Sequence, residues 1–226
     1  MRHLTAYIIA TISMLCVSCA EGDNGPSVAC SYDIVCLGSQ TAEHGSVFSM
    51  YLPDSDREIV YTESRAVIDT SVVKVGDRLM LGYVPEGKPY ESGRVTVKGY
   101  TPIHNSPLMV SSSGVENELP DWRRDGVYLY SIWRAGDYIN VRARLTYSDK
   151  PREFVLVVDT DEIRAKVPVP TARLVHRLEV TKPNFERQVY TSFDISPLWR
   201  QTWIKGLRVL VSNTNLETDT FIFTKN

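Results

Sequence analysis

The feature that most limits the fold is a series of short apolar segments that starts near residue 31 and continues almost to the end of the chain. Nearly every segment is rich in Val, Ile, Tyr and Thr, and each ends at Gly, Pro, Asp or Asn. The first group of residues favours extended strands and the second favours turns. We find no convincing amphipathic periodicity of a helix. The sequence therefore predicts an all-β protein.

The first half contains five expected strands between residues 31 and 105. Curling so few strands into a small closed barrel removes exposed sheet edges, and five is the number of strands in an OB fold. Residues 64–73 are expected to form the connection across the end of this barrel. The sequence therefore predicts an OB-like barrel domain over residues 31–105, with strands at 32–39, 47–52, 58–62, 78–84 and 94–103.

A break in the strand rhythm separates the two halves. Residues 106–125 contain Pro107, the run Ser111-Ser112-Ser113-Gly114 and Pro120, and we expect them to form a domain linker. Residues 126–226 resume the pattern with about seven short strands, which fit an immunoglobulin-like β-sandwich. The strands are expected at 127–133, 138–147, 154–158, 174–181, 188–195, 207–212 and 220–223.

The N-terminus has the organisation of a bacterial lipoprotein signal. Arg2 supplies a positive charge, residues 4–15 form an apolar segment too short to span a bilayer, and small residues precede Cys19. An acylating enzyme needs a thiol at that position to attach diacylglycerol. The sequence predicts a signal peptide over residues 1–18, lipidation of Cys19 and a flexible tether over residues 19–30. The alternative is an ordinary cleaved signal in which Cys19 is incidental.

The predicted lipid makes the membrane the first expected partner. Bacterial lipoproteins carry several acyl chains, and two or more chains anchor a protein firmly. We therefore expect an outer membrane lipoprotein of a Gram-negative bacterium. Glu21 and Asp23 match an acidic surface-export signal only in part, which leaves periplasmic and surface-exposed positions open.

The charge balance argues against nucleic acid as a partner. The chain has 25 basic and 27 acidic residues, and removal of Arg2 with the signal peptide leaves a net charge of −3. Phosphate binding depends on clustered positive charge, which this composition does not provide. The ligands that we expect are a peptide, a protein or a glycan.

Three segments of the second half resemble a known family when taken together. They are residues 131–141 (SIWRAGDYINV), 192–198 (SFDISPL) and 206–211 (GLRVLV), and they follow a lipobox and a barrel-like first half. Their order and spacing resemble the NigD-like lipoproteins of Gram-negative anaerobes. The resemblance implies an N-terminal OB-like domain, a C-terminal β-sandwich and a role in bacteriocin immunity. It provides no active site.

Basic and aromatic side chains of the second half form a candidate binding face. Arg142 and Arg144 share one side of an expected strand. Arg134 lies across the hairpin turn expected at residues 135–137, and Tyr128 and Tyr130 precede it. Arginine beside tyrosine suits an acidic peptide, a carbohydrate or a lipid headgroup. The alternative is a solvent-facing sheet surface in which the arginines serve solubility and edge protection.

Trp199 and Trp203 form a second candidate binding feature. They are four residues apart after Pro197, which places them on one side of a short helical turn. We expect them to cap the core of the second domain. A pair of nearby tryptophans also stacks on sugar rings, which keeps a carbohydrate-binding function open.

The remaining polar residues predict no cofactor and no metal site. Asp159, Asp161 and Glu162 gather three carboxylates that suit Ca²⁺, but they lack the spacing and glycine of an EF-hand loop, so a solvated loop is favoured. His176 alternates with leucines on an apolar strand face and is expected to be a hydrogen-bonded core residue. Cys30 and Cys36 would lie about 20 Å apart on one strand, too far for a disulfide.

The sequence thus favours a non-catalytic, lipid-anchored envelope protein that acts by binding. It contains no G-x-S-x-G nucleophile elbow and no glycine-rich phosphate loop. A carbohydrate-binding surface lipoprotein is the first alternative, and a hydrolase with residues drawn from the domain interface is the second.

Overall fold

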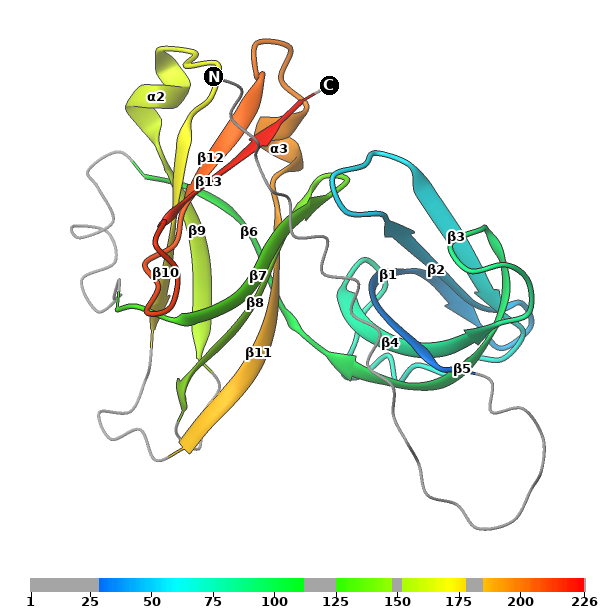
Figure 1. Cartoon of the computed structure of the whole chain (residues 1–226). Coiled ribbons are helices and arrows are strands. Elements are labelled where there is room, and N and C mark those ends of the chain that lie inside the picture. The colour runs from blue at the N-terminus through cyan, green and yellow to red at the C-terminus, as the bar shows by residue number, and fades with distance from the viewer. Residues whose placement is uncertain (1–28, 112–124, 148–151, 178–184, 226) are drawn as a thin grey trace, which may run out of the picture.

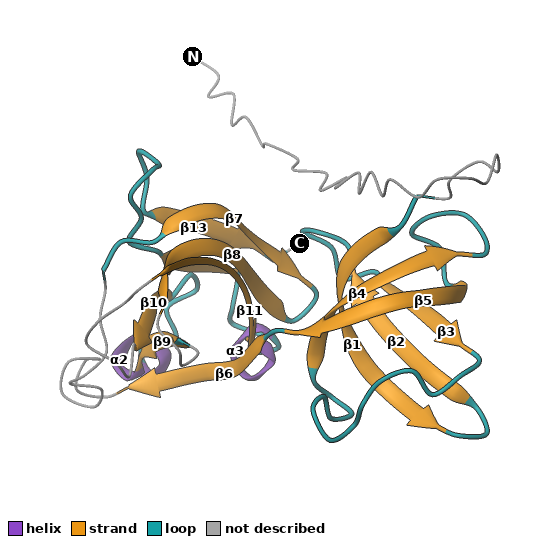
Figure 2. Cartoon of the chain, turned by 90° about the horizontal axis from the view of Figure 1, so that it is seen from below, coloured by secondary structure: helices purple, strands orange, loops and turns teal. Residues whose placement is uncertain are grey.

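The computed structural model describes residues 29–111, 125–147, 152–177 and 185–225, and this part of the chain consists of strands with two short helices (Figure 1). Figure 2 shows the strands as two bodies side by side, a barrel and a strongly curled sheet. The all-β class predicted from the sequence is confirmed.

The first sheet is a closed five-stranded barrel with the strand order β1-β2-β3-β5-β4. β1 pairs with β4 through its first half and with β2 through its second half, and a register shift between Leu37 and Ser39 helps this strand to bend around the barrel. The predicted OB-like barrel is confirmed. Its strands are β1 (Ser31–Thr41), β2 (Gly45–Tyr51), β3 (Glu58–Glu63), β4 (Arg78–Pro85) and β5 (Gly93–Pro102).

The connection between β3 and β4 packs onto the barrel core, as the sequence predicts for residues 64–73. Ile68 and Val73 are buried among the inward-facing residues of the barrel strands. The side-chain amide of Gln40 holds this connection by pairing with both backbone groups of Ile68: its oxygen accepts from the N–H at 2.9 Å and its nitrogen donates to the carbonyl at 2.7 Å. The side chain of Gln40 thus satisfies the two backbone groups of Ile68 that a neighbouring strand would otherwise bond.

The second sheet has eight strands in the order β13-β12-β10-β9-β6-β11-β8-β7. Its hydrophobic core is formed by inward-facing residues of β7 to β12 and by Trp199. The strands are β6 (His104–Ser111), β7 (Tyr128–Ala135), β8 (Tyr138–Tyr147), β9 (Glu153–Asp159), β10 (Thr171–Arg177), β11 (Phe185–Asp194), β12 (Gly206–Leu210) and β13 (Thr220–Thr224), and the helices are α2 (Thr160–Arg164) and α3 (Ser196–Trp199).

Strand β6 corrects the predicted start of the linker. Residues 106–111, assigned to the linker because of Pro107 and the serines, belong to this strand, and residues 112–124 lie outside the described part. β6 pairs in parallel with β11 up to Pro107 and in parallel with β9 from Leu108 onward. The proline, which has no N–H, occupies the position where the strand changes partner.

This shared strand also makes the second half different from an immunoglobulin-like sandwich. An immunoglobulin-like domain has two separate antiparallel sheets, whereas β6 joins both layers here and a third parallel pair links β10 with β12. The two ends of the curled sheet meet where Val127 bridges Asn213 and where the side chain of Asn215 bonds the N–H and the carbonyl of Leu129, at 2.8 and 3.0 Å. The spacing of short strands does not specify which strands pair, so the sequence could not distinguish these topologies.

The barrel and the second sheet are joined directly. Ile103 alone separates β5 from β6. The turn after β2 also pairs with the β7–β8 hairpin: the N–H of Asp54 donates to the carbonyl of Arg134 at 2.7 Å, and the N–H of Gly136 donates to the carbonyl of Ser55 at 2.9 Å. Covalent continuity and backbone hydrogen bonds therefore fix the hairpin against the barrel (Figure 1).

Among the described residues, Arg134 is one of two buried arginines at this junction. Its side chain is 3% exposed and forms an ion pair with Asp56 of the barrel. It also donates to the carbonyl of Gly136 at 2.8 Å, and its guanidinium lies over the ring of Trp199 at 5.0 Å. A planar guanidinium suits such a site because it can donate in plane and stack on an aromatic ring.

Arg78 makes a second contact between the two bodies. It is 2% exposed, and its guanidinium lies 4.0 Å from the centre of the Tyr138 ring of β8. The side chain of Asn105 in β6 bonds both backbone groups of Arg78, accepting from the N–H at 3.1 Å and donating to the carbonyl at 2.9 Å. Burial lowers the pKa of Arg78, but a guanidinium keeps its charge at neutral pH.

We predict that Gly136→Ala destabilises the protein by about 3 kcal/mol, because Gly136 has a φ of 57° and an added Cβ would lie 2.6 Å from the ring of Tyr51. The control Gly87→Ala, where nothing lies within 4 Å of the added Cβ, should change stability by less than about 0.5 kcal/mol. Denaturant unfolding followed by tryptophan fluorescence measures both. Equal midpoints for the two variants would contradict the proposed docking of the hairpin.

Candidate functional site

The outer surface of β7, β8 and β11 carries a cluster of arginine and tyrosine side chains. β8 lies between the other two strands, and its alternation places Arg142 and Arg144 outward while Val141 and Ala143 enter the core. In the register, Arg144 is opposite Tyr128 on one side, and Arg142 is opposite Tyr190 on the other. We call this surface the Arg–Tyr face; it consists of Tyr128, Tyr130, Arg142, Arg144, Gln188 and Tyr190.

Stacking contacts order the Arg–Tyr face. The guanidinium of Arg144 lies over the ring of Tyr128 at 4.7 Å, and that of Arg142 lies over Tyr130 at 4.9 Å and over Tyr190 at 5.7 Å. Tyr128 and Tyr130 contact each other with ring centres 5.1 Å apart. Cation–π contacts of this kind hold a long arginine side chain in one orientation. The two arginines and two tyrosines predicted as a binding face therefore do lie together.

Polar partners on β11 complete this surface. Arg142 Nη2 donates to Gln188 Oε1 at 3.0 Å, and Gln188 Nε2 donates to the hydroxyl of Tyr190 at 3.1 Å. Glu186 Oε2 lies 3.4 Å from Arg144 Nε, in an ion pair whose side chains are 59% and 41% exposed. The sequence analysis missed these three β11 residues because their position beside β8 depends on strand order.

Arg134, Trp199 and Trp203 do not belong to the Arg–Tyr face. Arg134 is opposite the core residue Ile139 in the register, so its side chain points to the domain junction. Trp199 ends α3 and is 3% exposed, while Trp203 is half-buried against the same core. Both tryptophans pack on the core of the second domain, as predicted, but α3 ends at Trp199, so the predicted helical turn does not extend to Trp203. Because Trp199 is buried, the tryptophan pair cannot stack on a sugar without rearrangement.

A recess of about 220 Å³ adjoins the Arg–Tyr face and shares Tyr128 and Arg144 with it. His176 lies in its lining and is 2% exposed. Arg152 Nη1 donates to His176 Nδ1 at 2.9 Å, so the proton is on Nε2, which donates to the carbonyl of Asp125 at 3.1 Å. His176 is therefore the hydrogen-bonded core histidine that the sequence predicts, and both ring nitrogens are engaged.

A second recess, of about 250 Å³, lies at the domain junction. Its lining includes Tyr51 and Asp56 of the barrel and Asp137, Trp199 and Arg200 of the second half. Arg200 pairs with Asp137 at 2.7 Å, so the charges in this recess are largely matched within the protein. This is the domain interface in which the hydrolase alternative would have to place its catalytic residues.

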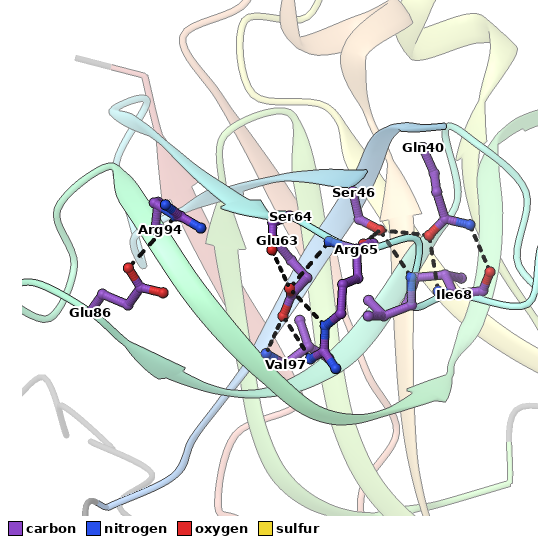
Figure 3. Close-up of polar contacts among 10 residues, drawn as sticks. Gln40, Ser46, Glu63, Ser64, Arg65, Ile68, Glu86, Arg94 and Val97 are labelled. Atoms are coloured by element: carbon purple, nitrogen blue, oxygen red, sulfur yellow. Dashed lines mark hydrogen bonds and ion pairs between the residues drawn. The ribbon is translucent and has the colours of Figure 1, made fainter. Parts of the chain in front are cut away.

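The barrel contains a polar network around a buried glutamate (Figure 3). Glu63 at the end of β3 is 4% exposed, and it accepts hydrogen bonds from Arg65 Nε at 3.2 Å and from the N–H of Val97 at 3.0 Å. The hydrogen bond from Arg65 is the main reason that the pKa of Glu63 falls from 4.5 to about 2, although burial opposes the shift. The charged carboxylate therefore ties together β3, the following connection and β5.

A second buried polar group lies inside the barrel. The hydroxyl of Tyr83 donates to Asp33 at 2.8 Å and lies 3.1 Å from the hydroxyl of Tyr61. Burial raises the pKa of Asp33, and the hydrogen bond from Tyr83 partly offsets this rise. Both tyrosines are less than 3% exposed, so the group is part of the barrel interior.

The acidic loop predicted to be solvated has a local structural role. Asp159 caps α2 by accepting from the N–H of Asp161 at 2.8 Å, and Glu162 accepts from the N–H of Thr171 at 2.5 Å. Within the described ranges, no group of three or more His, Cys, Asp or Glu side chains is arranged to hold a metal ion.

Cys30 and Cys36 are both free thiols, as the expected geometry requires. Cys36 lies in β1, in the barrel wall, and contacts the carbonyl of Gly76 at 3.4 Å. In the same described part of the chain, neither helix is long and apolar enough to cross a membrane. The predicted lipidation site Cys19 lies outside the described residues.

Comparisons with known proteins identify solved structures that have this fold. No family model and no curated protein matches the sequence. A solved protein of unknown function from Bacteroides vulgatus matches with a TM-score of 0.65 at 17% identity, over 87% of this chain and 91% of that chain. A candidate lipoprotein from Bacteroides fragilis matches with a TM-score of 0.56 at 12% identity, over 85% and 95%. At these identities the likeness establishes the fold.

The chain is thus an all-β protein with the two-part fold of these Bacteroides structures. More particularly, a NigD-like immunity protein from Bacteroides caccae has this fold, with a TM-score of 0.58 at 15% identity over 88% of this chain and 92% of that chain. The resemblance to NigD-like proteins predicted from three short segments is therefore supported by the structure.

We predict that Glu63 makes the barrel sensitive to acid. Its folded-state pKa is lowered, so its contribution is complete above about pH 4.5 and is lost as the pH falls towards 2. The full shift corresponds to about 3 kcal/mol, and we expect about 2 kcal/mol because Arg65 is 66% exposed and screened by solvent.

The measurement is the free energy of unfolding between pH 7 and pH 2 for wild type and Glu63→Gln. The variant should be less stable at pH 7 and should lose less stability on acidification. Glu217→Gln, in an exposed loop, serves as the control and should follow wild type. Parallel pH profiles for wild type and Glu63→Gln would disprove this role of the carboxylate.

Proposed function

We propose that the protein is a lipid-anchored envelope protein that acts by binding a partner on its Arg–Tyr face and not by catalysis. The observation that carries this proposal is the exposed, ordered cluster of two arginines and three tyrosines on one sheet. Tyr128 and Tyr130 are 38% and 42% exposed although they pack against each other and under guanidinium groups. Arginine and tyrosine are the residues enriched in protein-binding surfaces.

The hydrolase alternative has little support from the two recesses. In the recess beside the Arg–Tyr face, His176 engages both ring nitrogens with Arg152 and the carbonyl of Asp125, so it is not placed to act as a general base. Among the described residues that line the recess at the domain junction there is no serine, cysteine or histidine. The carbohydrate alternative depends on stacking by the tryptophan pair, and Trp199 of that pair is buried.

The envelope location rests on the sequence and on the kind of protein that shares the fold. The lipobox at Cys19 predicts attachment to the outer membrane, facing either the periplasm or the medium. One protein with the same fold is described as a candidate lipoprotein and another as a NigD-like immunity protein. An immunity-like role would mean that this chain intercepts an antibacterial peptide or protein near the membrane.

We predict that the mature protein begins at an acylated Cys19. Mass spectrometry of protein extracted from the native membrane should find an N-terminal peptide whose mass includes diacylglycerol. Cys19→Ser should abolish membrane attachment and leave an uncleaved or soluble protein, whereas Cys30→Ser should remain attached. An unmodified thiol at Cys19, or a mature form that begins elsewhere, would disprove the tether.

We predict that a photo-cross-linking residue at Tyr130 captures a specific envelope component. The matched control replaces Ile222 of β13, which is 54% exposed but lies on another part of the second sheet. The adduct at Tyr130 should disappear when Arg142 and Arg144 are both replaced by Gln, and the control should give none. Equal adducts at both positions, or none at Tyr130, would contradict binding at this face.

A further inference from the structure

The arginines of the Arg–Tyr face are held ready for an anion. Arg142 is stacked between Tyr130 and Tyr190, and Arg144 lies over Tyr128. Ordering a free arginine side chain when a ligand binds costs conformational entropy. The stacking tyrosines reduce this cost because both arginines are already ordered. Neighbouring outward positions on one strand also bring the two guanidinium groups close together. A ligand with two negative groups can therefore contact both without reordering either.

Glu186 already contacts one of the two guanidinium groups, that of Arg144. Its carboxylate lies 3.4 Å from Arg144 Nε, a buried atom that has no hydrogen-bond partner within the described residues. The Glu186 side chain is nevertheless 59% exposed, and an ion pair with such a partner contributes little because water solvates the released carboxylate well. The carboxylate is thus near the guanidinium but weakly held, as expected for an internal group that a ligand can displace.

Arg142 has a neutral partner instead. Gln188 accepts from its Nη2 and donates in turn to the hydroxyl of Tyr190. This series of hydrogen bonds orients the guanidinium, and no acidic side chain of the described residues forms an ion pair with Arg142. When Glu186 moves away from Arg144, the face carries two uncompensated positive charges, which favours an anionic ligand.

The chemistry of the face favours a carboxylate-bearing polypeptide over a glycan. Guanidinium groups bind carboxylates through paired N–H donors. One face of each of the three tyrosine rings is already covered by an arginine, which leaves less ring surface for sugar stacking. The tyrosine hydroxyls and ring edges remain as contacts of the kind that polypeptides make.

We propose that the Arg–Tyr face binds an acidic polypeptide segment and that Glu186 is the internal group which the segment's carboxylate displaces from Arg144. This inference rests on the proposed function, because it names the ligand chemistry of the same face. It makes a specific prediction for Glu186: loss of its charge should strengthen binding, although the substitution removes a contact from the protein.

The test measures binding of a fluorescent, end-blocked hexaglutamate peptide to the full mature protein by anisotropy at low salt. Relative to wild type, Glu186→Gln should tighten binding about threefold, which is the scale of one exposed ion pair. Arg144→Gln should weaken it about tenfold or more. Arg173→Gln removes one exposed positive charge from β10, outside the face, and should have little effect. Hexaglutamine should not bind.

Each other outcome rejects the inference. No binding of hexaglutamate by wild type or by Glu186→Gln would do so, as would equal weakening by Arg144→Gln and Arg173→Gln. Binding to vesicles with anionic phosphatidylglycerol, without binding to hexaglutamate, would identify a lipid headgroup as the ligand instead. The cross-linking at Tyr130 separates the two proposals: a specific adduct without hexaglutamate binding would retain the binding function and reject the acidic ligand.

Discussion

The buried guanidinium of Arg134 is the contact on which the arrangement of the two bodies depends. A charge removed from water is costly unless it is paired and hydrogen-bonded. Asp56, the carbonyl of Gly136 and the ring of Trp199 provide these partners, and they come from the barrel, from the arginine's own hairpin and from α3. The arginine is therefore satisfied only when the hairpin lies against the barrel. The backbone pairing of residues 54–55 with residues 134–136 follows from the same position.

This docking also decides which part of the sheet can bind a partner. Along the outer surface of β8, Tyr138 is covered by Arg78 of the barrel, and Asn140 is fully buried and bonded by Ser192 of β11. Further along the same strand, Arg142 and Arg144 lie beyond the contact with the barrel and pack against tyrosines. The outward residues of β8 thus contact the barrel at one end of the strand and form the proposed binding face at the other end. The barrel limits the binding face at the junction end.

Much of this architecture follows from the sequence because strands and turns depend on local residue preference. The barrel strands, the hairpin at residues 135–137, the buried His176 and the outward arginines of β8 were all predictable from alternation. Strand order was not, because pairing partners come from distant segments: β6 lies between β9 and β11, and β11 supplies Gln188 and Glu186 to the candidate site. Arg134 was misplaced for a related reason. A register shift between Leu129 and Ser131 changes which residues of β7 share a side with Arg142.

The direct passage from β5 to β6 has a mechanical consequence. With only Ile103 between them, the last strand of the barrel continues into a central strand of the second sheet, and the docked hairpin provides a second point of attachment. Two points of attachment prevent the rotation that a single flexible joint would permit. The molecule should therefore tilt and turn as one rigid lever, and a load applied to the barrel would reach the middle of the second sheet without passing through a compliant segment.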